Sequence, residues 1–291
     1  MKIFSWLVRR EFWENRAIWI IPPVIGAALT LATLFGRVDV NGVILSMNRR
    51  TAVSALMLFG FGMIFFLVMN VYATWYLLDC LYAERKDRSI LFWKSLPVSD
   101  TATVLAKLFT ALIAIPLVYF VAADLSTLLM AFVVSVRGRN AIAASLWSAD
   151  LWLQLQALWL YLILTTAIWY LPIAGWLIAV SAWARRAVML WSVLTPLGLC
   201  LLERWFFGTH LLGSLLLDRT FDYTSHAFRD LPGGGVWVTL ATDGDWLAAP
   251  GGIWRVFDPI GFLASPATWI GSVVGALFVV AAIQLRIRRT E

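Results

Sequence analysis

The chain has 291 residues, of which 61% are hydrophobic and 14% charged, and its formal net charge is +6. Soluble domains are usually about half apolar and a quarter charged, so this composition excludes a soluble globular protein and indicates an integral membrane protein. At about 20 residues per crossing, the length allows several membrane helices but no sizeable second soluble domain. The basic residues are separated by apolar runs, so they mark membrane topology and do not predict nucleic-acid binding.

Residues 1–16 mix bulky apolar and charged side chains. Phe4 and Leu7 fall on one helical face, whereas Arg10 and Glu14 are predicted to point away from it. This pattern, together with aromatic residues suited to the headgroup boundary, predicts a short interfacial helix that leads into the first membrane span. The alternative is a simple positively charged flank.

Six apolar runs are long enough to cross a bilayer. They cover about Ala17–Phe35, Ala52–Leu78, Ala102–Val136, Ala149–Ala184, Ala187–Phe207 and Pro266–Leu285. The third is longer than a bilayer needs and is expected to tilt or protrude. The fourth is expected to kink, or to break near Pro172.

Six crossings put both termini on the same side of the membrane, and the distribution of Lys and Arg favours the cytoplasm for that side. The fold class predicted is therefore an all-α membrane protein in which residues 1–291 form a single transmembrane domain. The organisation predicts a multi-pass membrane protein, and we expect its membrane to be a bacterial inner membrane.

The segment 81–98, between the second and third runs, combines five consecutive charges (Glu84 to Arg88) with four bulky apolar residues (Ile90 to Trp93). A loop in water does not need the apolar block, and a segment in lipid cannot carry the charges cheaply. The pattern predicts a helix on the cytoplasmic membrane surface, with its charged side free for a protein partner. The alternative is a solvated, positively charged loop.

Residues 208–265 differ from the rest because they are rich in turns, as at Pro232-Gly-Gly-Gly. Their apolar stretches, such as Leu211–Leu217, are too short to cross a bilayer. This segment is predicted to form an external cap or a re-entrant hairpin packed on the bundle, between the fifth and sixth spans.

Asp124 lies inside the third span. A lone carboxylate at that depth costs about 2.5–3.5 kcal/mol on insertion scales, so it usually faces a partner or water. Two interpretations remain open at this point: Asp124 lines a translocation path, or it has a structural role, either in a hydrogen bond with a neighbouring helix or at a position nearer the interface.

The charged segment carries a family resemblance. Residues 82–89, followed by Leu96-Pro97 and then Lys107, resemble the membrane subunit of ABC-2-type transporters. In that family a Glu-Arg pair, here Glu84-Arg85, opens a cytoplasmic coupling helix. Lys86 departs from the pattern, since many relatives have a second acid there.

The N-terminus and the architecture extend the resemblance to the whole chain. Arg10-Glu11-Phe12 resembles the basic-Glu-apolar triplet of the family's N-terminal interfacial helix. Six spans, with a surface helix between the second and third, match the family's organisation.

The resemblance implies the transmembrane subunit of an ATP-driven exporter of a lipid, a peptide or a hydrophobic compound. The chain would pair with a copy of itself or a close relative. It would also bind two nucleotide-binding subunits, which would hold ATP and magnesium. The residues that would contact those subunits are Glu84, Arg85, Lys86, Asp87, Arg88 and Ser89.

No enzymatic activity and no cofactor or metal site are expected in this chain. The sequence has no Gly-x-x-x-x-Gly-Lys-Ser/Thr loop, so ATP hydrolysis is expected in the partner. An intramembrane hydrolase needs paired groups at one depth, and Asp79 and Asp124 are not expected to meet. A membrane sensor or immunity protein without an ATPase is the other alternative, and it gives no reason for the surface helix.

Overall fold

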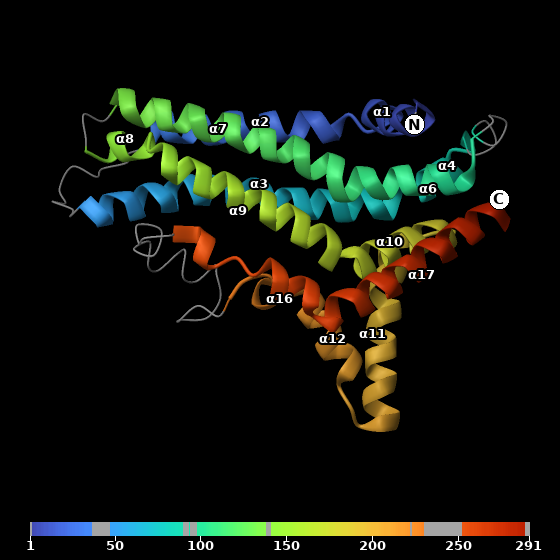
Figure 1. Ribbon diagram of the computed structural model, residues 1–291. Helices are drawn as coiled ribbons and strands as arrows, with labels where there is room; N and C mark the ends of the chain where they lie inside the picture. Colours follow the sequence, from blue (N-terminus) through green and yellow to red (C-terminus); the bar gives the residue numbers. More distant parts are fainter. Residues whose placement is uncertain are drawn as a thin grey trace.

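The computed structural model describes residues 2–36, 47–89, 93, 98–137, 141–221, 223–229 and 252–288. Within these residues every regular element is a helix, and six helices are long and apolar enough to cross a membrane. The predicted all-helical, multi-pass architecture is therefore confirmed at this level. The axes of most of the long helices lie roughly along one line, with the chain running in either direction along it, and the axis of α11 crosses them (Figure 1).

The six helices lie close to the predicted bounds. They are α2 (Ala17–Phe35), α3 (Met47–Asp79), the continuous α6–η1–α7 (Asp100–Phe109, Thr110–Ala114, Ile115–Arg137), α9 (Ala149–Trp169), α11 (Val188–Phe207) and α17 (Pro266–Arg288). The middle part of the third span, η1, is a π-helical turn that comes just before Pro116. Proline has no backbone N–H to donate, and a π turn is one way for a helix to accommodate the missing bond.

The fourth apolar run breaks into two helices, as one of the two predictions stated. α9 ends at Trp169, and α10 (Leu171–Trp183) starts with Pro172 in its first turn. Because α10 has 13 residues, it is too short to span a bilayer in one crossing. It packs closely on α17, where a Cβ added to Gly175 would lie 2.5 Å from the carbonyl oxygen of Gly275.

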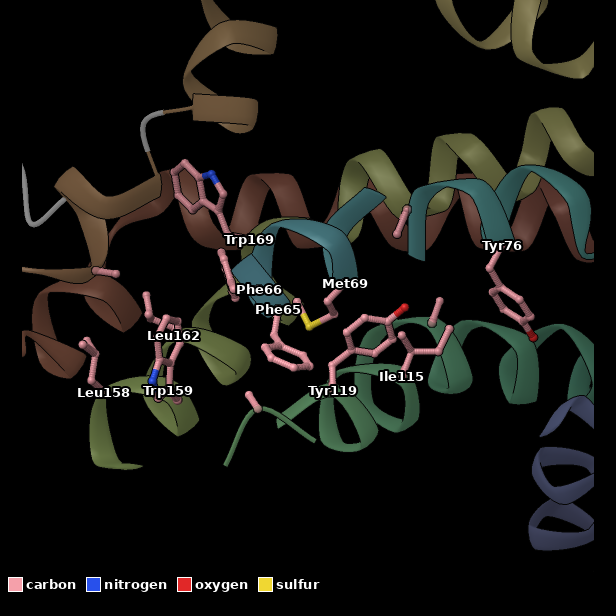
Figure 2. Close-up of a cluster of buried hydrophobic side chains, with 14 of the residues drawn as sticks. Phe65, Phe66, Met69, Tyr76, Ile115, Tyr119, Leu158, Trp159, Leu162 and Trp169 are labelled. Carbon is pink, nitrogen blue, oxygen red and sulfur yellow. The ribbon is translucent and has the colours of Figure 1, made fainter. Parts of the chain in front are cut away.

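Bulky apolar side chains from α3, α7 and α9 form the core of the bundle (Figure 2). The ring of Trp159 stacks on that of Phe59 with centroids 5.2 Å apart. Gly62 makes room for the indole, since a Cβ there would lie 2.4 Å from Trp159. In this cluster the helices are held together by apolar contacts.

The first helix, α1 (Lys2–Glu14), lies at a steep angle to α2 and at the same end of the bundle as the last turns of α17 (Figure 1). Its buried face includes Leu7, Arg10 and Glu11. The prediction that Arg10 points away from the packed face is wrong. Its guanidinium points inward because it forms ion pairs with the carboxylates of Glu11 on α1 itself and of Glu84 on α4 (Tyr82–Lys86).

Two helices project from the bundle as a hairpin, formed by α11 and α12 (Leu211–Phe221) (Figure 1). Val188 and Ser192, both in its first turns, are the buried residues of α11. At the tip, the carboxylate of Glu203 accepts hydrogen bonds from the backbone N–H groups of Leu211 (2.7 Å) and Leu212 (2.8 Å), which caps α12.

The region predicted as a cap or re-entrant hairpin contains short helices and an isolated antiparallel bridge between Phe228 and Phe257 where it is described, and it packs on α9. Besides α12, it contains α13 (Tyr223–Ala227), η2 (Gly252–Arg255) and α16 (Pro259–Ala264). Residues 230–251, with the predicted Pro-Gly turns, lie outside the described residues. The short α8 (Ala141–Leu146) precedes α9 at the opposite end of the bundle from α1.

Candidate functional site

Five charged side chains meet where α1, α4, α6 and α17 converge, and we call them the ionic cluster. Each has a relative exposure of 5% or less. The members are Arg10, Glu11, Glu84, Lys107 and Arg286. The cluster thus ties the first helix of the chain to the last one. Burying ions is costly, several kcal/mol per ion, unless each finds a partner of opposite charge.

Glu84 is the centre of the cluster because three cations from three different helices contact its carboxylate. Its Oε1 lies 3.0 Å from Arg10 Nη2 and 3.1 Å from Lys107 Nζ. Its Oε2 lies 2.5 Å from Arg286 Nη1. Arg286 also donates from Nε to Asp100 Oδ1 at 2.8 Å, at the partly exposed rim.

Glu11 forms the second anionic centre. Both of its carboxylate oxygens lie within 3.0 Å of Lys107 Nζ, at 2.9 and 3.0 Å. Tyr76, on α3, donates its hydroxyl to Glu11 Oε2 at 2.7 Å, and Arg10 donates to Oε1 at 2.8 Å. Lys107 therefore bridges the two buried carboxylates, which explains how a lysine can lie two turns inside an apolar helix.

Arg10 links the cluster to the segment that follows α4. Its guanidinium carbon lies 4.1 Å from the ring centroid of Trp93, a cation–π distance. Burial favours neutral Arg10, but the carboxylates of Glu11, Glu14 and Glu84 outweigh that effect and hold its pKa above the ordinary value. Glu14 lies at the rim, and burial raises the pKa of its carboxyl.

Glu11, Glu14 and Glu84 have carboxylate oxygens within 4.8 Å of one another, a grouping that can hold a metal ion. Here, however, the cations of Arg10 and Lys107 lie between those oxygens at hydrogen-bonding distance. The chemistry of the group is therefore that of an ion-pair network.

Arg85 and Ser181 join α4 to α10 from both directions. Arg85 Nη2 donates to the carbonyl oxygens of Ser181 (2.5 Å) and Ala184 (2.8 Å), at the C-terminal end of α10. In return, Ser181 Oγ accepts from the backbone N–H groups of Leu81 (3.2 Å) and Tyr82 (3.1 Å), at the start of α4. Each helix thus satisfies backbone groups that the other leaves unpaired at its terminus.

The predicted partner-contact residues separate into two groups in the structure. Glu84 is buried and Arg85 is half-buried, and both bind within the chain. Lys86, Asp87 and Arg88 are exposed. The prediction that Glu84 and Arg85 belong to a free charged surface is wrong, because both side chains bind groups within the chain. The exposed charges of this segment are those of Lys86, Asp87 and Arg88.

Of the rest of the predicted surface helix, beyond Arg88, the structure describes only Ser89, Trp93 and Val98. Ser89 is half-buried and donates its hydroxyl to the carbonyl oxygen of Glu84 at 3.2 Å. Arg88 has a φ of 56°, in the left-handed region, so the chain turns sharply after α4. Residues 90–92 and 94–97, with most of the apolar block and Leu96-Pro97, lie outside the described residues.

The N-terminal triplet Arg10-Glu11-Phe12 faces the interior of the protein, as Glu84 and Arg85 do. Arg10 and Glu11 are buried in the ionic cluster, and Phe12 is half-buried against the core. The exposed side chains of α1 include Ile3 (59%), Trp6 (59%) and Trp13 (57%). The residue types of this outward face are those that favour a membrane interface.

Asp124 pairs with a neighbouring helix, which is one of the two interpretations left open. Gln156 on α9 donates from Nε2 to Asp124 Oδ1 at 2.7 Å. Asp79, the other carboxylate considered for a hydrolase, is the last residue of α3, at the end of the bundle that holds the ionic cluster. A role for Asp124 in a translocation path stays a prediction.

Sequence reasoning missed Tyr76, Asp100, Ser181 and Arg286 as members of this site. Asp100 is the first residue of α6, and Ser99 before it caps that helix by accepting a hydrogen bond from the N–H of Ala102 at 3.2 Å. A usable signal existed for Lys107, since a charge inside an apolar run requires a partner. Comparison with protein-family models, with curated proteins and with solved structures found no match to this chain.

Proposed function

We propose that the chain is the transmembrane subunit of an ATP-driven exporter of the ABC-2 type, working as a dimer with a copy of itself or a close relative. In this proposal both termini and α4 face the cytoplasm of a bacterial cell, where a separate nucleotide-binding subunit docks. The observation that carries the proposal is the contrast within α4 and the residues just after it. Three exposed charged residues directly follow two that are anchored inside the bundle.

This arrangement suits the transmission of force. A partner that binds Lys86, Asp87 and Arg88 pushes on a short helix in which charge-assisted hydrogen bonds fix Glu84 and Arg85. Through Glu84 the push reaches α1, α6 and α17, and through Arg85 it reaches the end of α10. A solvated loop has no such connections.

The route continues into α11, which begins four residues after Ala184. Ala187, its N-cap residue, has a φ of 52°, which is uncommon for a residue with a side chain. Arg185 and Arg186 in this turn are exposed. We propose that the turn is the pivot about which α11 moves when α4 is displaced.

The test is a charge reversal at the exposed residues of a tagged chain expressed together with the nucleotide-binding subunit proposed as its partner. The triple variant Lys86→Glu, Asp87→Arg, Arg88→Glu is expected to lose the ATPase during purification while it unfolds at the same temperature as the wild type. Arg204→Glu, an exposed charge at the end of α11, is the matched control and is expected to retain the partner. Unchanged co-purification of the triple variant would refute the docking role.

A further inference from the structure

The turn between α10 and α11 carries two adjacent arginines, Arg185 and Arg186, and both are exposed. Among the ion pairs of the described residues, none involves either guanidinium. Three other basic side chains at this end of the bundle differ from them, since Arg10, Lys107 and Arg286 are buried against carboxylates in the ionic cluster. The turn therefore presents two positive charges with which no carboxylate of the described residues pairs.

The turn is anchored to the bundle on both sides. Before it, Arg85 donates to the carbonyl oxygen of Ala184 at 2.8 Å. After it, Trp176 of α10 donates from Nε1 to the carbonyl oxygen of Ser192 in α11 at 3.1 Å. Ala187 lies between these two contacts with a φ of 52°. The two arginines are thus presented from an ordered backbone, so a ligand does not have to order the turn when it binds.

Two exposed tryptophans flank the arginines in the chain. Trp183 ends α10 and is 41% exposed, and Trp191 lies in the first turns of α11 and is 45% exposed. Their rings meet edge to face, with centroids 5.3 Å apart. Tryptophan is enriched at the headgroup level of membranes, because its ring is apolar and its N–H is polar. The pair therefore indicates that the turn lies at the level of the lipid headgroups.

The surface becomes apolar directly after the turn. Met189 and Leu190 are 63% and 56% exposed, and α11 continues with exposed apolar side chains such as Leu194. No Asp, Glu, Lys or Arg occurs between Arg186 and Glu203. A cationic pair at the border of a long apolar surface matches an amphiphile with an anionic headgroup, because the headgroup meets the arginines while the acyl chains meet the apolar side chains.

The charged residues after α4 provide a contrast at the same end of the bundle. Lys86, Asp87 and Arg88 carry both signs of charge, and residues 82–89 include no exposed apolar side chain. A protein surface of mixed charge complements such a segment. The α10–α11 turn has charges of one sign beside exposed tryptophan, methionine and leucine. This combination favours an anionic lipid over an acidic protein.

We propose that the α10–α11 turn binds the phosphate headgroup of an anionic phospholipid through Arg185 and Arg186, between Trp183 and Trp191. A guanidinium donates two parallel hydrogen bonds to a phosphate, which a lysine ammonium does not. In a zwitterionic lipid the ammonium group offsets the charge of the phosphate, so such a lipid gains less from the two arginines. This site goes beyond the ATPase coupling proposed above and does not depend on it.

The experiment uses the full chain in phosphatidylethanolamine vesicles with a phosphatidylglycerol probe that carries a diazirine near its headgroup. Light-induced adducts are mapped by mass spectrometry, and they are expected on Trp183, Met189 and Leu190. The double variant Arg185→Gln, Arg186→Gln is expected to raise the probe fraction needed for half-maximal labelling about thirty-fold, the value of two basic residues near an anionic membrane surface. Because both side chains are exposed, this variant should unfold at the wild-type temperature.

The matched control removes two exposed arginines elsewhere at the same end of the bundle. Arg9→Gln, Arg16→Gln makes the same change in charge and is expected to leave labelling of the turn unchanged. A phosphatidylethanolamine probe with the same diazirine, at the same fraction, is expected to label the turn far less.

Three results would overturn the proposal. The first is no labelling of the turn by the phosphatidylglycerol probe, and the second is equal labelling by the zwitterionic probe, which would mean bulk contact with lipid. The third is an equal response of the two double variants, because the net charge of this end of the protein would then account for the labelling.

Discussion

The ionic cluster and the α11–α12 hairpin contrast in how each is stabilised. In the cluster, buried charges from helices far apart in the sequence satisfy one another within the chain. In the hairpin, α11 exposes Leu194, Leu201 and Trp205, among others, and keeps few buried side chains. The cluster is therefore stabilised by contacts within the chain, whereas the hairpin depends on lipid or on another chain to cover its apolar surface.

The largest expected effect comes from removing the centre of the cluster. Glu84→Gln leaves Arg10, Lys107 and Arg286 with one buried carboxylate fewer, and breaking a buried ion pair costs about 3–5 kcal/mol. Thermal unfolding of the purified protein in detergent is expected at a clearly lower temperature. Asp87→Asn, at an exposed charge three residues away, is the control and should leave the transition in place.

A smaller effect is expected at the α4–α10 connection. Ser181→Ala leaves the N–H groups of Leu81 and Tyr82 without their acceptor, which costs about 1–3 kcal/mol. Hydrogen exchange at residues 81–85 should become faster. Ser272→Ala removes only a bond within one helix and is the control. Equal protection in both variants would mean that Ser181 does not hold α4.

A matched pair of glycine substitutions compares the bundle with the hairpin directly. Gly175→Ala forces a Cβ against the backbone of α17, and overpacking of this kind costs about 1–3 kcal/mol. Gly198, in α11, has open space around its Cβ position, so Gly198→Ala is expected to be neutral or slightly stabilising. Unfolding temperatures of the two variants provide the comparison, and equal losses would contradict the packing described.

The smallest effect is expected on the hairpin surface. Leu199→Gln, at a position 51% exposed, should change the stability of the detergent-solubilised bundle by less than about 0.5 kcal/mol. Leu162→Gln, at a fully buried position of α9, should be strongly destabilising. If the two variants unfold alike, α11 is packed on the bundle more closely than the structure indicates.

The sequence predicts the membrane helices well because apolar length is a local property. The first span coincides with α2, and Pro172 marks the place where the fourth run is interrupted. Proline does not decide between a kink and a break, since Pro22 and Pro23 lie inside the continuous α2. That the Glu84 side chain points into the protein, and not toward a partner, could not be predicted in the same way. Its partners Arg10 and Arg286 lie 74 and 202 residues away in the chain, and a local pattern of charges carries no information about them.

The central claim is that Glu84 is an internal anchor, and a double-mutant cycle between Glu84 and Arg286 tests it most directly. Glu84→Gln, Arg286→Gln and the double variant are compared with the wild type by unfolding in detergent. Residues that form one buried network show coupling of about 0.5–3 kcal/mol, so the double variant is expected to lose much less stability than the two single losses combined. Additive losses would contradict the account, because they would mean that the two side chains do not act as a pair.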